Sequence, residues 1–359
     1  MLGLYIHIPF CQSICSYCDF PKFMATGEKK RLYVDKLITD LDKIPSDVDT
    51  IYIGGGTPNS LDDWELERLF QALIRFNPLE FTVEINPELL TPSQAKLFAK
   101  YHINRISMGV QSFNESLLKK IGRKHHYEDI KKAVELLKHE GISNINVDLI
   151  YAIPSEGLDD VKRDLEEFLR LDIPHISFYS LILEEKTILY HQYQKGEIKL
   201  IDEDLEAAMY ETICDFLKNH GFHHYEISNF ARPGFESLHN QIYWHNEKYY
   251  GVGLGASGYI DNKRYTNSKT LKGYLNNQLE EITEISKEDA LNEEFLLGLR
   301  LVDGVSISEI EEKYQISLQE RFPFLNQLVD KKLLEISQDR LKLTKLGLLL
   351  GNEVFAYFV

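Results

Sequence analysis

The sequence has no long apolar run and no export signal. None of its 359 residues lies in a stretch approaching the roughly 18 uncharged apolar residues of a membrane span. The first residues lack the basic, apolar and small-residue order of a secretory signal, and no low-complexity segment or short-period repeat occurs. These absences argue against a membrane-spanning, exported or repeat protein, and we expect a protein of the reducing cytoplasm.

The chain is also short of positive charge. It holds 40 lysines and arginines against 56 aspartates and glutamates, a formal net charge of −16. Nucleic-acid binding requires clustered basic side chains to meet phosphates, so we expect no nucleic-acid partner. With 43% hydrophobic residues the chain can still build a core for a domain of about 250 residues and a smaller one.

Only four cysteines occur, and three of them lie within eight residues. Cys11, Cys15 and Cys18 have the spacing Cys-x3-Cys-x2-Cys. Three thiolates so close on one loop can hold three corners of a cubic 4Fe–4S cluster. An electron-transfer ferredoxin normally supplies a fourth Cys. The fourth iron would here stay open to a small molecule, which favours a catalytic type of cluster.

The cysteines allow two other interpretations. A disulfide would leave one of the three thiols unpaired, and clustered cysteines in a chain without a secretory signal more often form metal or redox sites. A structural zinc site would need a fourth ligand, which His7 could offer, although no second Cys-x2-Cys pair follows. We expect Cys214, in a predicted helix, to be a small buried hydrophobe.

Short β-rich runs alternate with amphipathic helical runs over residues 1–220. This alternation predicts a parallel sheet with crossover helices. The predicted strands are 4–8, 50–53, 81–85, 105–110, 144–151 and 175–183. The predicted helices include 92–101, 127–139, 158–171 and 202–220, with earlier ones around 34–41 and 66–73. Six units are visible and a closed (β/α)8 barrel needs eight, so the predicted fold class is α/β, a partial (β/α)6 TIM-like barrel.

The remaining chain is divided into two further parts. We expect residues 221–285 to form a segment at the edge of the barrel. Residues 286–359 predict helices at 287–301, 306–314 and 319–331, a hairpin of 333–337 with 341–344, and a last helix at 345–358. Three helices and a hairpin resemble a winged-helix-like α+β module. Its 9 basic and 13 acidic residues favour a packing or protein-contact role over DNA binding.

Polar groups gather where the predicted strands end. The Cys loop follows the first strand, Gly54–Gly56 follows the second, and Glu84 ends the third. Gln111, Arg123 and Asp148 lie on or just after later strands. Taken singly, each of these groups is as consistent with a tight turn or a solvated side chain as with a ligand site. Because the carboxyl ends of parallel strands meet at one edge, together they predict a site for a polar ligand.

Three motifs, occurring in order, resemble the radical S-adenosylmethionine (SAM) superfamily. They are the run from Tyr5 to Phe20 with its three cysteines, the turn Gly-Gly-Gly-Thr-Pro at 54–58, and the run Gly-Val-Gln-Ser-Phe at 109–113. The branch they resemble contains the oxygen-independent coproporphyrinogen III oxidases and the HemW haem chaperones. The resemblance covers nearly the whole chain.

The resemblance implies a radical SAM barrel with a 4Fe–4S cluster on Cys11, Cys15 and Cys18. SAM would chelate the open iron, and one-electron reduction would cleave it to methionine and a 5′-deoxyadenosyl radical. Motif by motif, the implied SAM contacts are Tyr5, Tyr17, Gly55, Gly56, Thr57, Glu84, Gln111, Arg123 and Asp148.

Two departures separate the chain from the oxidases. Phe20 stands where their signature has a further Cys, and only ten residues precede Cys11. The segment 225–244 ends in His-Asn-x2-Tyr-Trp, which in the HemW family is associated with haem, and which implies haem contacts at His239, Asn240, Tyr243 and Trp244. The alternative is a hydrogen-bonded His239, with Tyr243 and Trp244 packing the barrel edge. The family often has His where Ser257 stands.

The resemblance therefore implies a haem chaperone that binds haem and transfers it to a respiratory haemoprotein, dependent on the cluster and SAM. Peripheral membrane contact is expected only through that recipient. The alternative is an enzyme, an oxygen-independent coproporphyrinogen III oxidase that forms protoporphyrinogen IX. The fold allows SAM cleavage, but we expect no such oxidase activity. The sequence identifies neither the recipient nor the electron donor.

Overall fold

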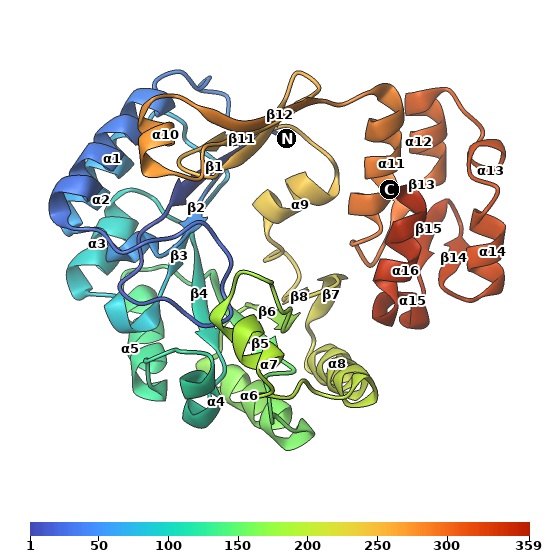
Figure 1. The fold of residues 1–359 in the computed structure, drawn as a ribbon, viewed down its shortest axis with the longest axis horizontal. Coiled ribbons are helices and arrows are strands. Elements are labelled where there is room, and N and C mark those ends of the chain that lie inside the picture. The colour runs from blue at the N-terminus through green and yellow to red at the C-terminus, as the bar shows by residue number, and fades with distance from the viewer.

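Six parallel strands form the centre of the computed structural model, which describes residues 1–359 (Figure 1). They are hydrogen-bonded in sequence order, each to the next. The strands are β1 (Gly3–Ile8), β2 (Thr50–Gly55), β3 (Glu80–Ile85), β4 (Arg105–Gln111), β5 (Ile145–Tyr151) and β6 (His175–Ser180). The predicted partial barrel of six parallel strands is thereby confirmed.

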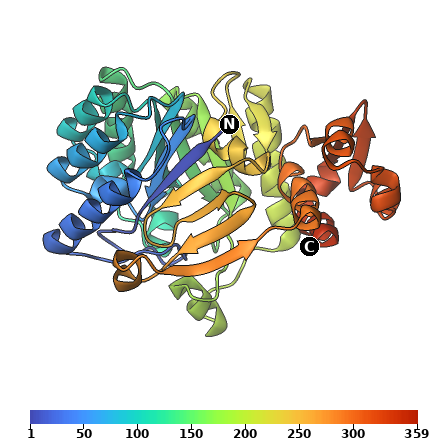
Figure 2. The ribbon, with the colours of Figure 1, turned by 90° about the horizontal axis from the view of Figure 1, so that it is seen from above.

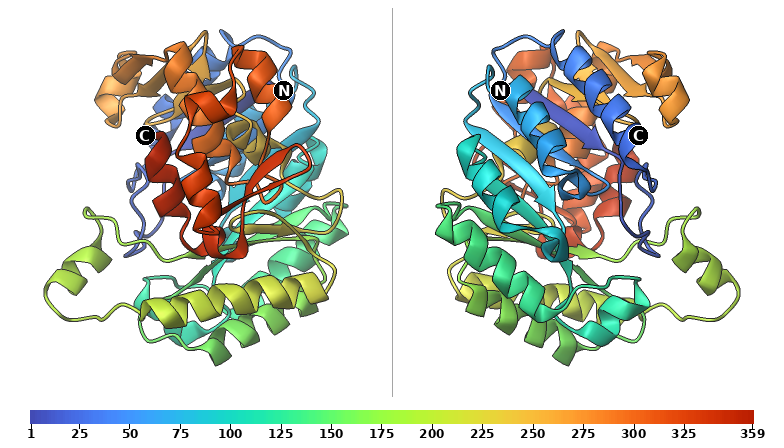
Figure 3. Two further views of the ribbon diagram at one scale, coloured as in Figure 1. Left: turned by 90° about the vertical axis from the view of Figure 1, so that its right-hand side faces the viewer. Right: turned by 90° about the vertical axis from the view of Figure 1, so that its left-hand side faces the viewer.

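Helices cover the outside of these strands (Figures 1 and 3). They are α1 (Gly27–Leu41), α2 (Asp63–Leu73), α3 (Pro92–Lys100), α4 (Glu115–Lys120), α5 (Tyr127–His139), α6 (Leu158–Leu171) and α8 (Glu203–Asn219), whereas α7 (Ile188–Gln194) projects away from the barrel. One face of each strand meets them: Leu4, Ile6 and Ile8 of β1 are fully buried in a core of 53 residues. No helix in the chain combines the length and apolarity needed to cross a membrane.

Residues 221–285 extend the sheet at both of its edges. Next to β6 lie β8 (Asn229–Ala231) and then β7 (His223–Glu226); next to β1 lie β9 (Tyr249–Val252), β10 (Ser257–Ile260), β11 (Lys263–Asn267) and β12 (Leu279–Glu284). Between these two groups the chain forms the short helix α9 (Leu238–Trp244), and α10 (Leu271–Leu275) follows β11. The sheet has 12 strands and does not close, so a single segment lies at both sides of the opening.

The C-terminal part has its own core of 17 buried residues and lies beside the barrel (Figure 2). Its elements are α11 (Lys287–Gly298), β13 (Val305–Ser306), α12 (Ile307–Tyr314), α13 (Leu318–Arg321), α14 (Leu325–Asp330), β14 (Leu334–Ser337), β15 (Arg340–Leu343), α15 (Lys345–Leu349) and α16 (Gly351–Phe355). The predicted hairpin is present as β14 and β15, and β13 joins it as a third strand.

Two predicted helices of this module are each interrupted. The prediction of one helix at 319–331 is wrong, because Pro323 has no amide N–H to continue it and the chain forms α13 and α14 instead. The prediction of one helix at 345–358 is also wrong. The backbone leaves the helical region at Leu350 (φ −108°, ψ 29°), after which α16 places Val354 and Phe355 in the module core.

The inner face of the six strands is polar. Successive strand residues point to opposite sides of a sheet, and the positions that alternate with the apolar ones carry polar side chains. On β2 to β6 these are Thr50, Tyr52, Thr82, Glu84, Arg105, Ser107, Asn146, Asp148, His175 and Ser177. A closed barrel fills its interior with branched apolar residues. This interior is instead lined for polar ligands or for hydrogen-bonded networks.

Candidate functional site

The cysteine loop lies between β1 and α1, at the carboxyl end of the strands. Backbone hydrogen bonds hold it on three sides: from Phe23 N to Pro9 O at 2.8 Å, from Ser16 N to Ile121 O at 3.0 Å, and from Leu189 N to Ser16 O at 2.9 Å. The loop is therefore fixed against the end of α4 and the start of α7.

All three loop cysteines are free and half-buried. The hydroxyl of Thr57 donates to Cys11 Sγ at 3.5 Å, and the guanidinium of Arg123 donates to Cys15 Sγ at 3.9 Å. Burial raises the pKa of Cys11 and of Cys18. Donors aimed at sulfur favour the thiolate form, which is the form that ligates metal. The donor set thus fits a thiolate-bound cluster.

His7 is not available as a fourth ligand for zinc. Its Nδ1 pairs with the Tyr5 hydroxyl at 2.9 Å and its Nε2 with the carbonyl of Pro21 at 2.8 Å. Burial lowers the pKa of His7 to about 4, so the ring is neutral. Nowhere in the chain do three His, Cys, Asp or Glu side chains converge on a single-ion site. The geometry does not support the zinc alternative.

The three glycines at the end of β2, Gly54–Gly56, make room for other side chains. A Cβ on Gly54 would lie 2.7 Å from Glu84 Oε1, and one on Gly55, whose φ is +113°, would lie 2.4 Å from the His7 ring. The Gly55 N–H donates to Glu84 Oε2 at 3.0 Å, and the Gly56 N–H donates to Ile8 O at 2.8 Å. Both amides are therefore hydrogen-bonded within the chain.

Two carboxylates project into the barrel interior, one on β3 and one on β5. Glu84 accepts from the Tyr52 hydroxyl at 2.8 Å as well as from Gly55. Asp148 accepts from Ser107 at 2.9 Å and from Asn146 at 2.9 Å. Burial raises the pKa of Glu84 to about 7 and also raises that of Asp148. Both are partly buried acids with raised pKa values at neighbouring places in the barrel interior, a combination typical of functional sites.

The remaining predicted SAM contacts gather at the same end. Arg123 donates to Asn86 Oδ1 at 2.9 Å and to the carbonyl of Gly109. Gln111 has a left-handed backbone, with φ +69°, at an irregularity between β4 and β5, a type of strain common at binding sites. Burial raises the pKa of Tyr17, beside Cys15 and Arg123. The structure therefore brings the predicted residues together around the cysteine loop, and their contact with SAM stays a prediction.

Sequence reasoning missed the residues that hold these groups. Tyr52 orients Glu84, Ser107 and Asn146 orient Asp148, and Asn86 orients Arg123. The sequence does carry a signal for most of them. Polar residues occupy every second position of β2, β4 and β5, and this alternation marks a polar inner face.

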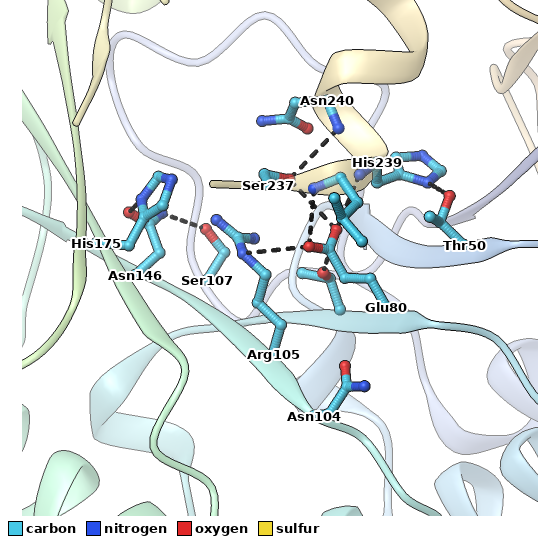
Figure 4. A network of polar contacts seen from close by, with 12 residues as sticks. Thr50, Glu80, Asn104, Arg105, Ser107, Asn146, His175, Ser237, His239 and Asn240 are labelled. Carbon is cyan, nitrogen blue, oxygen red and sulfur yellow. Dashed lines mark hydrogen bonds and ion pairs between the residues drawn. The ribbon is translucent and has the colours of Figure 1, made fainter. Parts of the chain in front are cut away.

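Helix α9 closes the amino-terminal end of the barrel (Figure 4). The N–H groups of Leu238 and His239 each donate to the Glu80 carboxylate at 2.9 Å, and the Ser237 hydroxyl donates to it at 3.3 Å. Arg105, 1% exposed, lies 4.0 Å from the same carboxylate. A carboxylate at a helix N-terminus is electrostatically favoured, and this one fixes α9 to β3.

His239 lies on the side of this helix that faces the barrel and is fully buried. Its Nδ1 pairs with the Thr50 hydroxyl at 2.7 Å and its Nε2 with the Tyr243 hydroxyl at 2.8 Å. With both nitrogens occupied, the ring has no lone pair to offer iron in this arrangement. This arrangement favours the alternative of a hydrogen-bonded histidine, and contact of His239 with haem stays a prediction. Asn240, Tyr243 and Trp244 are half-buried, and their contact with haem stays a prediction.

Two regions of the chain match known families. Residues 5–168 match the radical SAM superfamily, and residues 285–350 match the HemN C-terminal domain. The heme chaperone HemW of Lactococcus lactis is 44% identical over 99% of this chain and 96% of its own length. The chain belongs to the HemW family. HemW of Bacillus subtilis is 40% identical over 100% of this chain and 99% of its own length. HemW of Escherichia coli is 31% identical over 100% of this chain and 98% of its own length.

A solved structure shows the same fold. Coproporphyrinogen III oxidase HemN from Escherichia coli superposes with a TM-score of 0.86, covering 99% of this chain and 89% of its own, at 23% identity. The radical SAM fold of this HemW-family chain is thereby confirmed, including the arrangement of its C-terminal module beside the barrel.

Glu84→Gln should flatten the pH dependence of stability in the ligand-free protein. Because the folded-state pKa of about 7 exceeds the ordinary value for Glu, the contribution of Glu84 is full below about pH 4.5 and lost as the pH rises to about 7. Gln cannot ionise, and the Tyr52 hydroxyl can turn to accept from its amide. Between pH 5 and pH 8, the free energy of unfolding measured with urea should fall by about 2 kcal/mol more in the wild type than in the variant. Glu166→Gln, on the exposed face of α6, should show the same pH dependence of the free energy of unfolding as the wild type. If Glu84→Gln also shows the wild-type pH dependence, the raised pKa assigned to Glu84 is wrong.

His239→Ala should destabilise the ligand-free protein by about 3 kcal/mol, since it leaves a cavity and two buried hydroxyls without a partner. Urea unfolding measures the loss. His139→Ala, on the exposed end of α5, should change the free energy of unfolding by less than about 0.5 kcal/mol. A His239→Ala protein as stable as the His139→Ala protein would mean that the buried hydrogen bonds are not formed.

Proposed function

We propose that this chain is a haem chaperone that binds haem and passes it to a respiratory haemoprotein, dependent on a 4Fe–4S cluster and SAM. The observation that carries the proposal is the full-length match to HemW proteins, three of which are 31–44% identical along essentially the whole chain. A haem-binding assignment at the motif helix is part of the proposal, through Asn240, Tyr243 and Trp244.

The chain's own residues fit the proposed cofactors. Cys11, Cys15 and Cys18 would hold three irons, with Thr57 and Arg123 donating to the sulfurs as they already do. When bound, the cluster supplies one-electron reduction to a sulfonium cosubstrate at its open iron. The chain offers that cosubstrate two kinds of partner. Carboxylates of the chain suit the ammonium and hydroxyl groups of the cosubstrate, and a guanidinium of the chain suits its carboxylate.

Each of these partners is already oriented before any ligand arrives. Tyr52 and Gly55 hold Glu84, Ser107 and Asn146 hold Asp148, and Asn86 holds Arg123. Such a preset arrangement reduces the ordering cost of binding. We propose Tyr5, Tyr17, Gly55, Gly56, Thr57, Glu84, Gln111, Arg123 and Asp148 as the lining of the SAM site.

Phe20 favours a carrier over the oxidase. It stands where the oxidase signature has a further Cys, and its side chain is 59% exposed on the cysteine loop. An aromatic ring at this place supplies apolar surface but no thiol. The likeness to HemN carries the fold alone, because identity is only 23%.

Haem transfer tests the proposal directly. The chain, reconstituted with cluster without oxygen, is loaded with haem and mixed with a haem-free respiratory cytochrome, and the absorbance of the acceptor is followed with and without SAM. We expect acceptor haem to appear faster than from free haem. A parallel incubation with coproporphyrinogen III, SAM and a reductant should give no protoporphyrinogen IX. Formation of that product without haem transfer would overturn the proposal.

Single substitutions test the cluster ligands. Cys11→Ala, Cys15→Ala and Cys18→Ala should each remove the brown absorbance of the reconstituted cluster, because each deletes one thiolate ligand. Cys214→Ala is the matched control: that thiol lies on α8 beside Tyr210, and its loss should leave the iron content unchanged. Full iron content in all three loop variants would refute the ligand assignment.

A further inference from the structure

The turn after β4 is strained at one of the proposed SAM contacts. Gln111 has a left-handed backbone, with φ +69°, although it carries a Cβ. Residues other than glycine rarely adopt this conformation, and it persists only where the surrounding structure holds it. Other parts of the chain must therefore hold this turn in place.

The side-chain amide of Gln111 has no hydrogen-bond partner within the chain, and the residue is 9% exposed. The amide lies beside Gly109, where an added Cβ would come within 3.0 Å of Gln111 Nε2 and 3.6 Å of Arg123 Nη2. The guanidinium of Arg123 also donates to Cys15 Sγ at 3.9 Å. The strained turn thus places the Gln111 amide among the side chains at the cysteine loop.

Asp164 of α6 holds the residues that follow Gln111. Its Oδ1 accepts from the backbone N–H of Phe113 at 2.9 Å. The side-chain amide of Asn114 donates to Asp160, one turn earlier in α6, at 3.0 Å. Two successive residues of the turn are therefore bonded to α6, and these bonds fix the direction in which the chain leaves Gln111.

Packing alone does not account for an acid at position 164. The buried face of α6 otherwise consists mainly of apolar side chains, Val161, Leu165, Phe168 and Leu171, and Asp164 on this face is 1% exposed. Burial raises the pKa of its carboxyl to about 7, and its Oδ2 has no hydrogen-bond partner. An apolar side chain would avoid the cost of burying an unpaired carboxyl oxygen. The position therefore indicates a need for a hydrogen-bond acceptor.

We propose that Asp164 is a positioning residue for SAM, which acts by holding Gln111 in the conformation that meets the cosubstrate. The inference rests on the proposed function, since it takes Gln111 as part of the lining of the SAM site. Without an acceptor at position 164, the N–H of Phe113 would lose its partner, and the turn would relax to an unstrained backbone. The Gln111 amide would then leave its place at the cysteine loop.

Dissociation constants for SAM test the proposal, measured at pH 8 on the full chain reconstituted with its cluster without oxygen. Asp164→Ala should raise the dissociation constant about 10-fold. Asp164→Asn keeps an acceptor for the Phe113 N–H and should stay within about 3-fold of the wild type.

Glu156→Ala is the matched control. Glu156 is also a buried acid, 3% exposed, and it accepts from a backbone N–H, that of Ile153 at 2.9 Å. It lies in the loop after β5 and has no hydrogen bond to the turn after β4. The SAM dissociation constant of Glu156→Ala should therefore stay within about 3-fold of the wild type.

A double variant distinguishes positioning from a general loss of structure. Gln111→Ala should itself raise the SAM dissociation constant about 10-fold. Adding Asp164→Ala to Gln111→Ala should then change it by less than about 2-fold, because the group that Asp164 positions is already gone. Asp164→Leu fits the apolar face of α6 and also lacks an acceptor, so it replaces Asp164→Ala, with the same expectation, if the alanine variant does not fold.

The outcomes separate this inference from the proposed function. A wild-type chain that binds no SAM would overturn the proposed dependence on SAM. If the wild type binds SAM, any of three results would overturn the positioning role alone: additive effects of Gln111→Ala and Asp164→Ala, an Asp164→Asn protein as weak as Asp164→Ala, or no effect of Gln111→Ala. Failure of both Asp164→Ala and Asp164→Leu to fold would also overturn it, because Asp164 would then be required by the core.

Discussion

The buried carboxylate of Glu80 determines how the open barrel is completed. A carboxylate taken out of water must be compensated by charge or hydrogen bonds, and here the start of α9 and Arg105 compensate it. The helix has only seven residues, too few to be stable by itself. This one acidic side chain of β3, together with the pairing of Thr50 with His239, therefore holds α9 in position and keeps His239 buried.

A polar interior connects the end of the barrel that carries the cysteine loop with the end covered by α9. Tyr52 stands between them: its hydroxyl donates to Glu84 at 2.8 Å, and its ring stacks on His239 with centroids 5.2 Å apart. A ligand ammonium that engages Glu84 would compete for the carboxylate that Tyr52 now uses. One side chain thus contacts both Glu84, near the cysteine loop, and α9 at the other end of the barrel.

The sequence predicted elements governed by local periodicity and failed where distant contacts decide. The bounds of α5 and α6 agree with prediction to the residue, because their apolar positions repeat cleanly at helical spacing. The pairing of β9 beside β1 joins residues far apart in the chain and left no local signal. Motif resemblance singled out His239, but the burial of this residue and its pairing with Thr50 and Tyr243 follow from the packing of α9 against β2 and left no local signal.

The C-terminal module is attached to the barrel through two elements. Backbone hydrogen bonds join Ile227 N to Arg300 O at 3.0 Å and Val302 N to Tyr225 O at 3.1 Å, and Arg300 lies over the Trp244 ring at 4.9 Å. These contacts tie the module to the end of β7 and to α9. Because separating the module would break all of them at once, the position of α9 depends on the module as well as on β3.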